Sequence, residues 1–226
     1  MIKVKRKPFG EIQAMLKPFG SLLNVGCGGC ASVCLGGGQK EVQELNGELE
    51  AAAQVRGGLS VIQGYTVERA CNMFFLEELD SLVEQFECLG SMACSAGTQL
   101  IAERFPDKPV FPMVNTQAIG VDRDVGVYEE NCRACGDCVI GYTGGFCPVT
   151  RCAKGLFNGP CGGTQTGGMC EVDPNIACVW KLIYARLNQQ ARVADVLSIR
   201  EPMQWQDQVR RLVIQEPYRH RYADED

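Results

Sequence analysis

Residues 132–178 read CRACGDCVIGYTGGFCPVTRCAKGLFNGPCGGTQTGGMCEVDPNIAC. Eight cysteines stand among glycines in this stretch, and few apolar residues are available to build a core. Since hydrophobic burial is the main stabilising term in folding, something else must hold this segment together. Its composition favours thiolate coordination of metal. The candidate ligands in the stretch are Cys132, Cys135, Cys138, Cys147, Cys152, Cys161, Cys170 and Cys178.

The first part of the stretch has the spacing of an iron-sulfur motif. Cys132, Cys135 and Cys138 form Cys-x2-Cys-x2-Cys, as in bacterial ferredoxins, and Cys147-Pro148 matches the Cys-Pro pair of such motifs. Eight residues rather than three separate Cys138 from Cys147, so the match is incomplete. The intervening glycines permit the positive-φ turns that wrapping around a cluster requires.

The second part of the stretch carries enough thiolates for another site. Cys152, Cys161, Cys170 and Cys178 follow at wide, nearly even gaps, and four thiolates can hold a 4Fe-4S cluster or a tetrahedral zinc ion. These four could share one site, or the two sites could be interleaved, as in ferredoxins with two clusters. The stretch therefore predicts two metal sites and leaves the metals and the grouping open.

Two other roles for the cysteines compete with this interpretation. A disulfide framework is common in small secreted domains, but the chain opens MIKVKRKPFGEIQAML, without the apolar region of a signal peptide. A purely structural zinc module is the stronger alternative, because Cys-x2-Cys pairs also bind zinc. The third cysteine of the run favours iron. With fourteen cysteines, we expect the chain to work in the reducing cytoplasm with its thiolates bound to metal.

Composition narrows the range of partners and reactions. The 226 residues carry a net charge of -5 and include no basic stripe, so we expect no nucleic-acid partner. No apolar run has transmembrane length, and we expect no membrane insertion. The chain contains one histidine, which gives little support to a catalytic Cys/His or Ser/His pair.

The first half of the chain has the pattern of an α/β domain. Short apolar runs alternate with segments of helical periodicity, which indicates a parallel sheet with crossover helices. We expect strands at 21–25, 59–67, 87–93 and 110–114, and helices at 40–53, 73–86 and 97–105. Residues 3–20 could form an arm that packs on a neighbour or a surface helix of the same domain.

The second half is expected to be a cysteine-rich, metal-stapled module. Residues 116–130 are interpreted as a connector, with the boundary near Gly120, which gives an α/β domain over 1–120 and a module over 121–226. Asp173-Pro174 matches an N-cap and first helical position, so a helix is predicted to about Gln190. The tail after residue 194, which contains Met203, Trp205 and Tyr218, could pack on its own domain or dock on a partner.

The cysteines of the first half follow the ends of predicted strands. Cys27, Cys30 and Cys34 follow the first strand, Cys71 follows the second and Cys94 follows the third. Open α/β sheets bind ligands at this carboxyl edge, so a 4Fe-4S site is predicted there. Its fourth ligand is Cys71 or Cys94, and we favour Cys94. Cys88 falls within the third strand and is interpreted as a small buried hydrophobe.

The same loop also fits a nucleotide-binding pattern. Gly26-x-Gly28-x-x-Ala31 follows a strand, as in the dinucleotide fingerprint, in which glycines admit a pyrophosphate at a helix N-terminus. Cys27 and Cys30 occupy its variable positions, and the second strand has no clear acidic residue at its end to hold a ribose. A dinucleotide-binding oxidoreductase is therefore kept as the weaker alternative to a cluster loop.

Several motifs together resemble one known family, the methylenetetrahydrofolate reductase C-terminal domain. The motifs are Cys132-x2-Cys-Gly-Asp-Cys138, Gly144-Gly-Phe-Cys-Pro148, Lys154-Gly-Leu-Phe-Asn-Gly-Pro-Cys-Gly-Gly163, Gly168-Met-Cys-Glu171 and Cys178-Val-Trp180. Upstream, Cys27-Gly-Gly-Cys-Ala-Ser-Val-Cys34 and Ala93-Cys94 are similar to the amino-terminal half of the same proteins. The chain thus resembles the MetV-type small iron-sulfur and zinc subunit found in acetogenic and other anaerobic bacteria. The family position usually read as Cys-Gly is Cys94-Ser95 here.

The resemblance implies an accessory role in one-carbon metabolism, the Wood-Ljungdahl pathway included. In the family, the FMN of a MetF-type partner reduces 5,10-methylenetetrahydrofolate to 5-methyltetrahydrofolate, and the small subunit supplies electrons through its clusters. The chain is expected to be inactive on folate alone. Three sites of four thiolates would use twelve of the fourteen cysteines, and we expect two 4Fe-4S clusters plus a third cluster or a zinc. A zinc-stabilised docking subunit without redox role is the alternative.

Overall fold

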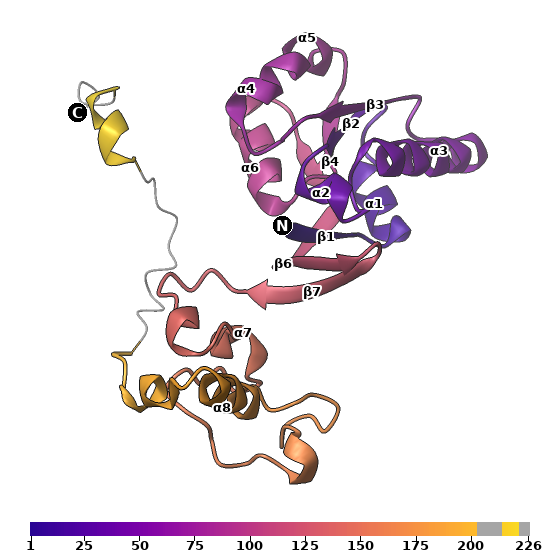
Figure 1. Cartoon of the computed structure of the whole chain (residues 1–226). Helices are drawn as coiled ribbons and strands as arrows, with labels where there is room; N and C mark the ends of the chain where they lie inside the picture. The colour runs from indigo at the N-terminus through magenta and orange to yellow at the C-terminus, as the bar shows by residue number, and fades with distance from the viewer. Residues whose placement is uncertain (203–213, 222–226) are drawn as a thin grey trace. The chain divides into compact units, whose positions relative to one another are not determined.

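The chain forms two compact units, Met1–Arg133 and Ala134–Asp226. The computed structural model describes residues 1–202 and 214–221. Figure 1 traces the elements along the chain.

A four-stranded parallel sheet forms the centre of the first unit. Its order is β3-β2-β4-β5, and its strands are β2 (Ser21–Cys27), β3 (Val61–Val67), β4 (Cys88–Ser91) and β5 (Val110–Pro112). Every neighbouring pair in this sheet is parallel. β2 is buried from Leu22 to Cys27, as expected for a central strand covered on both faces. The α/β class and the four predicted strands are confirmed.

Helices cover this sheet on both sides (Figure 1). They are α1 (Phe9–Leu16), α2 (Cys30–Val33), α3 (Gln39–Arg56), α4 (Met73–Leu76), η1 (Glu77–Leu79), α5 (Asp80–Val83) and α6 (Ser95–Arg104). In α3, which covers the predicted helix at 40–53, Val42, Leu45 and Leu49 lie on one helical face and are buried. The helix predicted over 73–86 is instead three short turns, although Leu76, Leu79 and Val83 do point into the core.

A second, antiparallel sheet has the order β1-β6-β7. It consists of β1 (Ile2–Arg6), β6 (Val114–Asp124) and β7 (Val127–Cys132). Residues 116–130 are therefore a hairpin rather than a connector, and residues 3–6 are a strand. Gly120, near which a boundary was expected, lies inside β6, and a Cβ there would lie 2.0 Å from the Glu129 carbonyl oxygen. The compact units instead divide after Arg133, because β6 pairs with both β1 and β7.

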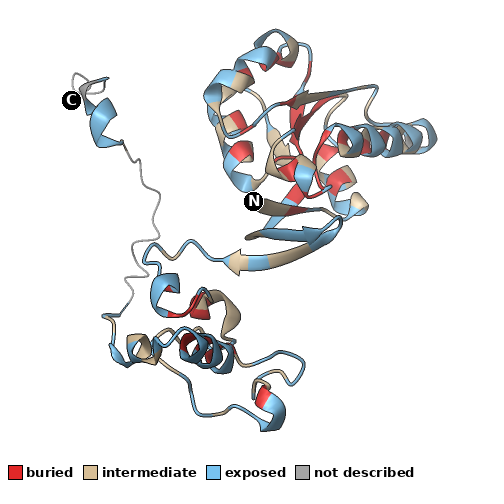
Figure 2. Cartoon of the chain, in the orientation of Figure 1, coloured by how far each residue is buried: buried red, intermediate tan, exposed pale blue. Residues whose placement is uncertain are grey.

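The second unit contains short helices joined by long glycine-rich segments. These are η2 (Ile140–Tyr142), α7 (Pro148–Arg151), η3 (Thr166–Gly168), α8 (Val179–Gln189), η4 (Val193–Leu197) and η6 (Glu216–Arg221). Figure 2 shows few buried segments here compared with the first unit. Val179, Trp180, Ile183 and Leu187 form one small cluster and Val139 and Val149 another. The predicted scarcity of core in this part of the chain is confirmed for the described residues.

The long helix of the second unit begins later than the sequence suggested. Its N-cap is Cys178, not Asp173. The Asp173 carboxylate accepts a hydrogen bond from the Asn175 N–H at 2.9 Å, so it closes a local turn instead of capping a helix. Ile176, which the predicted helix would have included, precedes α8 and is exposed. Cys178, a candidate metal ligand, therefore lies at the start of α8.

The segment after α8 packs on its own unit as far as Arg200. Val193 and Val196 contact the α8 cluster, and Asn158 and Arg200 exchange two hydrogen bonds of 2.9 and 3.0 Å. Met203 and Trp205, noted in the sequence as tail residues, lie outside the described residues, and Tyr218 is an exposed residue of η6. Within the described residues, no helix has both the length and the apolar character needed to cross a membrane.

Candidate metal centres

Three predicted ligands lie at one edge of the parallel sheet. Cys27 is the last residue of β2, Cys71 follows β3, and Cys94 is the N-cap of α6 after β4. Because β2 lies between β3 and β4, the carboxyl ends of these strands are neighbours. Cys27 is buried, Cys94 is half-buried and Cys71 is exposed. The sheet order therefore gathers thiols from three separate loops.

Close backbone contacts hold these loops together. The Gly28 N–H donates to the Val67 carbonyl at 2.8 Å, which joins the loop after β2 to the end of β3. A Cβ added to Gly97 in α6 would lie 3.0 Å from the Cβ of Ala70, so α6 packs directly on the loop that carries Cys71. Larger side chains at these glycines would separate the loops.

The three thiols at this edge interact electrostatically. Burial, followed by the neighbouring thiols of Cys27 and Cys94, raises the pKa of Cys71. The Arg69 guanidinium acts in the opposite direction on the same pKa. Thiols that raise one another's pKa are suited to a shared metal, because a bound cation removes the repulsion among thiolates.

Cys34, another predicted ligand, faces the protein interior. It is 5% exposed, and its Sγ accepts a hydrogen bond from the Val4 N–H in β1 at 3.3 Å. The same sulfur donates to the Ala31 carbonyl at 3.5 Å. Burial is the main reason that the pKa of Cys34 is raised. Cys30 begins α2 and is half-buried.

Cys88 is buried in β4, as the sequence suggested. Its side chain is inaccessible to solvent, and burial, followed by the nearby Glu87 carboxylate, raises the pKa of Cys88 to about 11. Its Sγ lies 3.5 Å from the Ser21 carbonyl, to which it donates. This thiol is a core residue.

The geometry gives no support to a dinucleotide loop at residues 26–31. The Cys27 N–H donates to the Gly37 carbonyl at 2.9 Å, and the Gly28 N–H is bonded to β3 as described above. These amides are occupied by protein, whereas a pyrophosphate requires free ones. α2 is also only four residues long, too short for the helix of such a motif.

In the second unit, four predicted ligands line one small cavity. They are Cys152, Cys161, Cys170 and Cys178, and Lys154, Glu171 and Trp180 line the same cavity. This arrangement matches the sequential grouping of the last four cysteines rather than the interleaved one. Cys135 and Cys147 pack elsewhere, against the small apolar cluster of Val139 and Val149.

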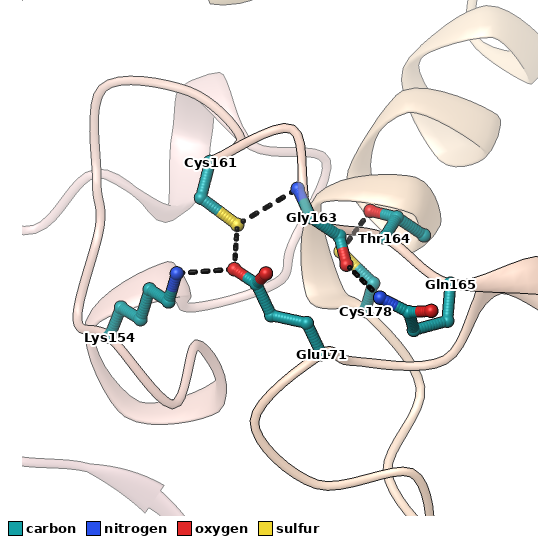
Figure 3. Close-up of polar contacts among 7 residues, drawn as sticks. All are labelled: Lys154, Cys161, Gly163, Thr164, Gln165, Glu171 and Cys178. Atoms are coloured by element: carbon teal, nitrogen blue, oxygen red, sulfur yellow. Dashed lines mark hydrogen bonds and ion pairs between the residues drawn. The ribbon is translucent and has the colours of Figure 1, made fainter.

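Charged and polar groups surround the sulfurs of this cavity (Figure 3). Cys161 Sγ donates to Glu171 Oε1 at 3.2 Å and accepts from the Gly163 N–H at 3.4 Å. Glu171 also forms an ion pair with Lys154. Hydrogen bonding to Lys154, then to Cys161, lowers the pKa of Glu171, and hydrogen bonding to Glu171 raises that of Lys154. The cavity therefore offers both N–H donors and a cation to negatively charged sulfur.

The surroundings of Cys178 favour its ionised form. Burial acts to raise its pKa, but the Thr164 hydroxyl, which donates to Cys178 Sγ at 3.2 Å, and backbone N–H groups of the first turn of α8 outweigh it. The net effect lowers the pKa of Cys178. A thiolate at a helix N-terminus is stabilised in this way by unpaired amides and by the helix dipole.

The cysteines of the ferredoxin-like run differ in exposure. Cys132 is the last residue of β7 and is exposed, as is Cys138, while Cys135 and Cys147 are half-buried. Ala134 and Gly136 have positive φ values of 50° and 89°. Alternating left-handed residues turn the backbone sharply between the cysteines, as the sequence predicted from its glycines. Arg200 pairs with Asp137 of this run at 3.1 Å.

In the part of the chain that the structure describes, no three cysteine, histidine or acidic side chains are close enough together to bind a single metal ion. The predicted ligands thus lie on neighbouring loops or around one cavity, but their side chains are farther apart than the ligands of a single metal ion. Sequence reasoning assigned no role to Lys154, Thr164 and Glu171. Lys154 and Glu171 lie within the motifs that carry the family resemblance, and Thr164 directly follows one of them.

A comparison with protein-family models finds one similarity. A family described as "Methylene-tetrahydrofolate reductase C terminal" matches residues 111–206, which include β6, β7 and the whole run of eight cysteines. No curated protein and no solved structure matches the chain. The match agrees with the family resemblance of the second half of the sequence.

Proposed function

We propose that this chain is the electron-transfer subunit of a methylenetetrahydrofolate reductase. The observation that carries the proposal is the family match over residues 111–206, which covers the glycine-rich segment with its eight cysteines. In this role the chain passes electrons through two or three 4Fe-4S clusters to the flavin of a MetF-type catalytic partner. That partner reduces 5,10-methylenetetrahydrofolate to 5-methyltetrahydrofolate.

The residues present fit a thiolate-bound cluster. Cysteine thiolates are the usual ligands of 4Fe-4S clusters, and hydrogen bonds to sulfur tune the reduction potential. The Gly163 N–H and the Thr164 hydroxyl already donate to cysteine sulfurs in the second unit. The proposed ligands are drawn from Cys27, Cys30, Cys34, Cys71, Cys94, Cys132, Cys135, Cys138, Cys147, Cys152, Cys161, Cys170 and Cys178. When bound, such clusters supply transfer of single electrons.

The chain's own residues would position and insulate these centres. Lys154 pairs with the Glu171 carboxylate beside Cys161, so its ammonium offsets the negative charge that Glu171 would otherwise add to the four thiolates. Trp180 covers one wall of the same cavity and donates its indole N–H to the Leu156 carbonyl at 3.1 Å. An apolar wall beside a thiolate site limits access of water.

A zinc ion at one site is the second candidate. The four cysteines around the Lys154 and Glu171 cavity border the small core of α8, where a metal would fasten the helix to the glycine-rich loops. A zinc there would make this centre structural and leave electron transfer to the others. If all sites held zinc, the chain would be a docking subunit without redox role.

The deciding experiment measures metals in the anaerobically purified chain. We expect about eight or more irons per chain with matching acid-labile sulfide, together with an electron paramagnetic resonance signal after dithionite reduction. The reduced chain should then reduce the FMN of a separately purified MetF-type partner, while a variant carrying Cys135→Ala should do so more slowly. Zinc without iron or sulfide would refute the electron-transfer role.

A further inference from the structure

The order of the strands indicates one position at which the parallel sheet could bind a ligand. Along the chain β2 is followed by β3 on one side of it and by β4 on the other, so the strand order reverses next to β2. At such a switch point the loops that leave adjacent strands diverge, and the carboxyl edge opens. The loops that leave β2, β3 and β4 here carry Cys27, Cys71 and Cys94.

Glycines make this edge compact enough for the three loops to share a ligand. A Cβ added to Gly29 would lie 3.6 Å from Cys27 Sγ and 3.4 Å from the Arg69 side chain. The chain at Gly29 therefore passes between the first thiol and the loop that carries Cys71. On the other side, Gly97 allows the start of α6, with Cys94, to pack on Ala70. The loops approach from both sides of β2.

Cys30 belongs to the same group by its position. It is three residues after Cys27, begins α2 and remains half-buried, with Gly28 and Gly29 between the two cysteines. The Cys-x2-Cys spacing lets both thiols reach one metal centre.

Cys34 differs from Cys27 in the contacts of its sulfur, although both cysteines are buried in the main core. Its Sγ accepts a hydrogen bond from the Val4 N–H in β1 and donates to the Ala31 carbonyl. As a metal ligand this sulfur would carry no S–H, so the hydrogen bond that it donates to the Ala31 carbonyl at 3.5 Å would be lost.

We propose that Cys27, Cys30, Cys71 and Cys94 are the four ligands of one metal centre at this switch point, and that Cys34 is a structural thiol of the core. Both Cys71 and Cys94 are ligands in this assignment, whereas the sequence alone suggested one of them together with Cys34. The assignment rests on the proposed function, which supplies the reason for a 4Fe-4S cluster there. Two thiols of the fourteen, Cys34 and Cys88, are then left as core residues, and twelve remain for three centres.

Arg69 gives the centre an adjacent positive charge. Its guanidinium stacks 5.3 Å from the Phe75 ring, and its side chain lies beside Gly29, whose added Cβ would be 3.4 Å from Arg69 and 3.6 Å from Cys27 Sγ. A cation beside a cluster favours the reduced, more negative state. Arg69→Gln should therefore lower the reduction potential of this centre and leave the metal content unchanged.

Four single variants of the whole chain, purified anaerobically, test the ligand set. Cys71→Ala and Cys94→Ala should each lower iron and acid-labile sulfide by about four atoms per chain and remove the same paramagnetic signal. Cys34→Ala and Cys88→Ala, which both alter buried thiols, should keep the metal content of the unaltered chain. Cys94→Ser is a check on folding, because serine is a good N-cap for α6; it should lower the iron content while circular dichroism stays unchanged.

The outcomes separate this assignment from the proposed function. Loss of iron from Cys34→Ala, with iron retained by Cys71→Ala or Cys94→Ala, would overturn the ligand set while the redox role stands. The same pattern of losses with zinc in place of iron would support the ligand set and make this centre structural, and the redox role would be refuted only if the chain held no iron or sulfide at all. Retention of all metal in both Cys71→Ala and Cys94→Ala overturns the ligand set, whichever metal the chain holds.

Discussion

The buried thiol of Cys88 makes the stability of the first unit depend on pH. Its pKa is about 11 in the folded chain against 9.0 in an unperturbed thiol. Because the pKa of the Cys88 thiol is higher in the folded chain, the unfolded chain loses this proton at a lower pH than the folded chain does. Between pH 9 and 11 the unfolded state is therefore stabilised by ionisation, and the folded state is not. Stability contributed by Cys88 is unaffected below pH 8 and falls as the pH rises through 9.

The size of this loss follows from the difference of about two pKa units. Each unit corresponds to about 1.4 kcal/mol, so the free energy of unfolding falls by about 1.4 kcal/mol at pH 10 and approaches a loss of about 2.7 kcal/mol above pH 11. Cys88→Ala removes the titrating group. Its cost, a small cavity in β4 worth about 1 kcal/mol, does not vary with pH.

The measurement compares urea unfolding of the whole chain and of the Cys88→Ala variant at pH 7 and pH 10, in excess reductant. Both tryptophans, Trp180 and Trp205, fall after residue 133, so tryptophan fluorescence does not report on the first unit. Unfolding of the first unit is therefore followed by circular dichroism, as the transition that does not appear in the fluorescence signal. The unaltered chain should lose about 1.4 kcal/mol more than the variant between the two pH values. Equal losses in the two proteins would contradict the argument and place the Cys88 thiol in contact with water or metal.

Three further substitutions, one of them paired with a control, test single contacts. Gly37→Ala should destabilise the first unit by about 1–3 kcal/mol or more in urea titrations, because its Cβ would lie 1.8 Å from the Met92 carbonyl oxygen. Its control is Gly47→Ala on α3, where the Cβ meets open space, and this variant should stabilise the unit by up to about 1 kcal/mol. Trp180→Phe removes one indole hydrogen bond and should cost about 1 kcal/mol in thermal unfolding of the second unit; no change would show that this bond is replaced by water. Thr164→Val removes the hydroxyl that donates to Cys178 and should weaken metal retention about 10-fold or more in competition with a chelator, and unaltered retention would count against that role.

Local periodicity was enough to locate most of the first unit. The apolar run at 21–25 is buried on both sides, and the helical spacing of Val42, Leu45 and Leu49 places all three in the core. These patterns depend on residues within a few positions of one another, which a sequence displays directly. Cysteines placed after consecutive strands also indicated correctly that Cys27, Cys71 and Cys94 reach one sheet edge.

Long-range pairing was not visible in the same way. β6 carries charged residues at 122–124 and looked like a connector, yet it pairs with β1 more than 100 residues away. An exposed hairpin can carry charges on both faces, which removes the alternating pattern that would reveal a strand. The orientation of Cys34 was hidden for the same reason, since its partner Val4 lies in β1.

Metal removal should unfold the two units to different extents, because they are stabilised by different means. Among the described residues after 133, the buried apolar side chains are Val139, Val149, Val179, Trp180, Ile183 and Leu187, whereas the first unit has a continuous core. At about 1.5–3 kcal/mol for each buried side chain, six residues cannot offset the ordering of the glycine-rich loops around them, since each ordered residue costs about 1–2 kcal/mol. Stripping the metal with a strong chelator should therefore abolish amide protection in α8 and preserve it in β2 and α3, as followed by hydrogen exchange. Protection of α8 that survives complete loss of metal would mean that packing alone holds this unit, and the cysteines would then need another explanation than coordination.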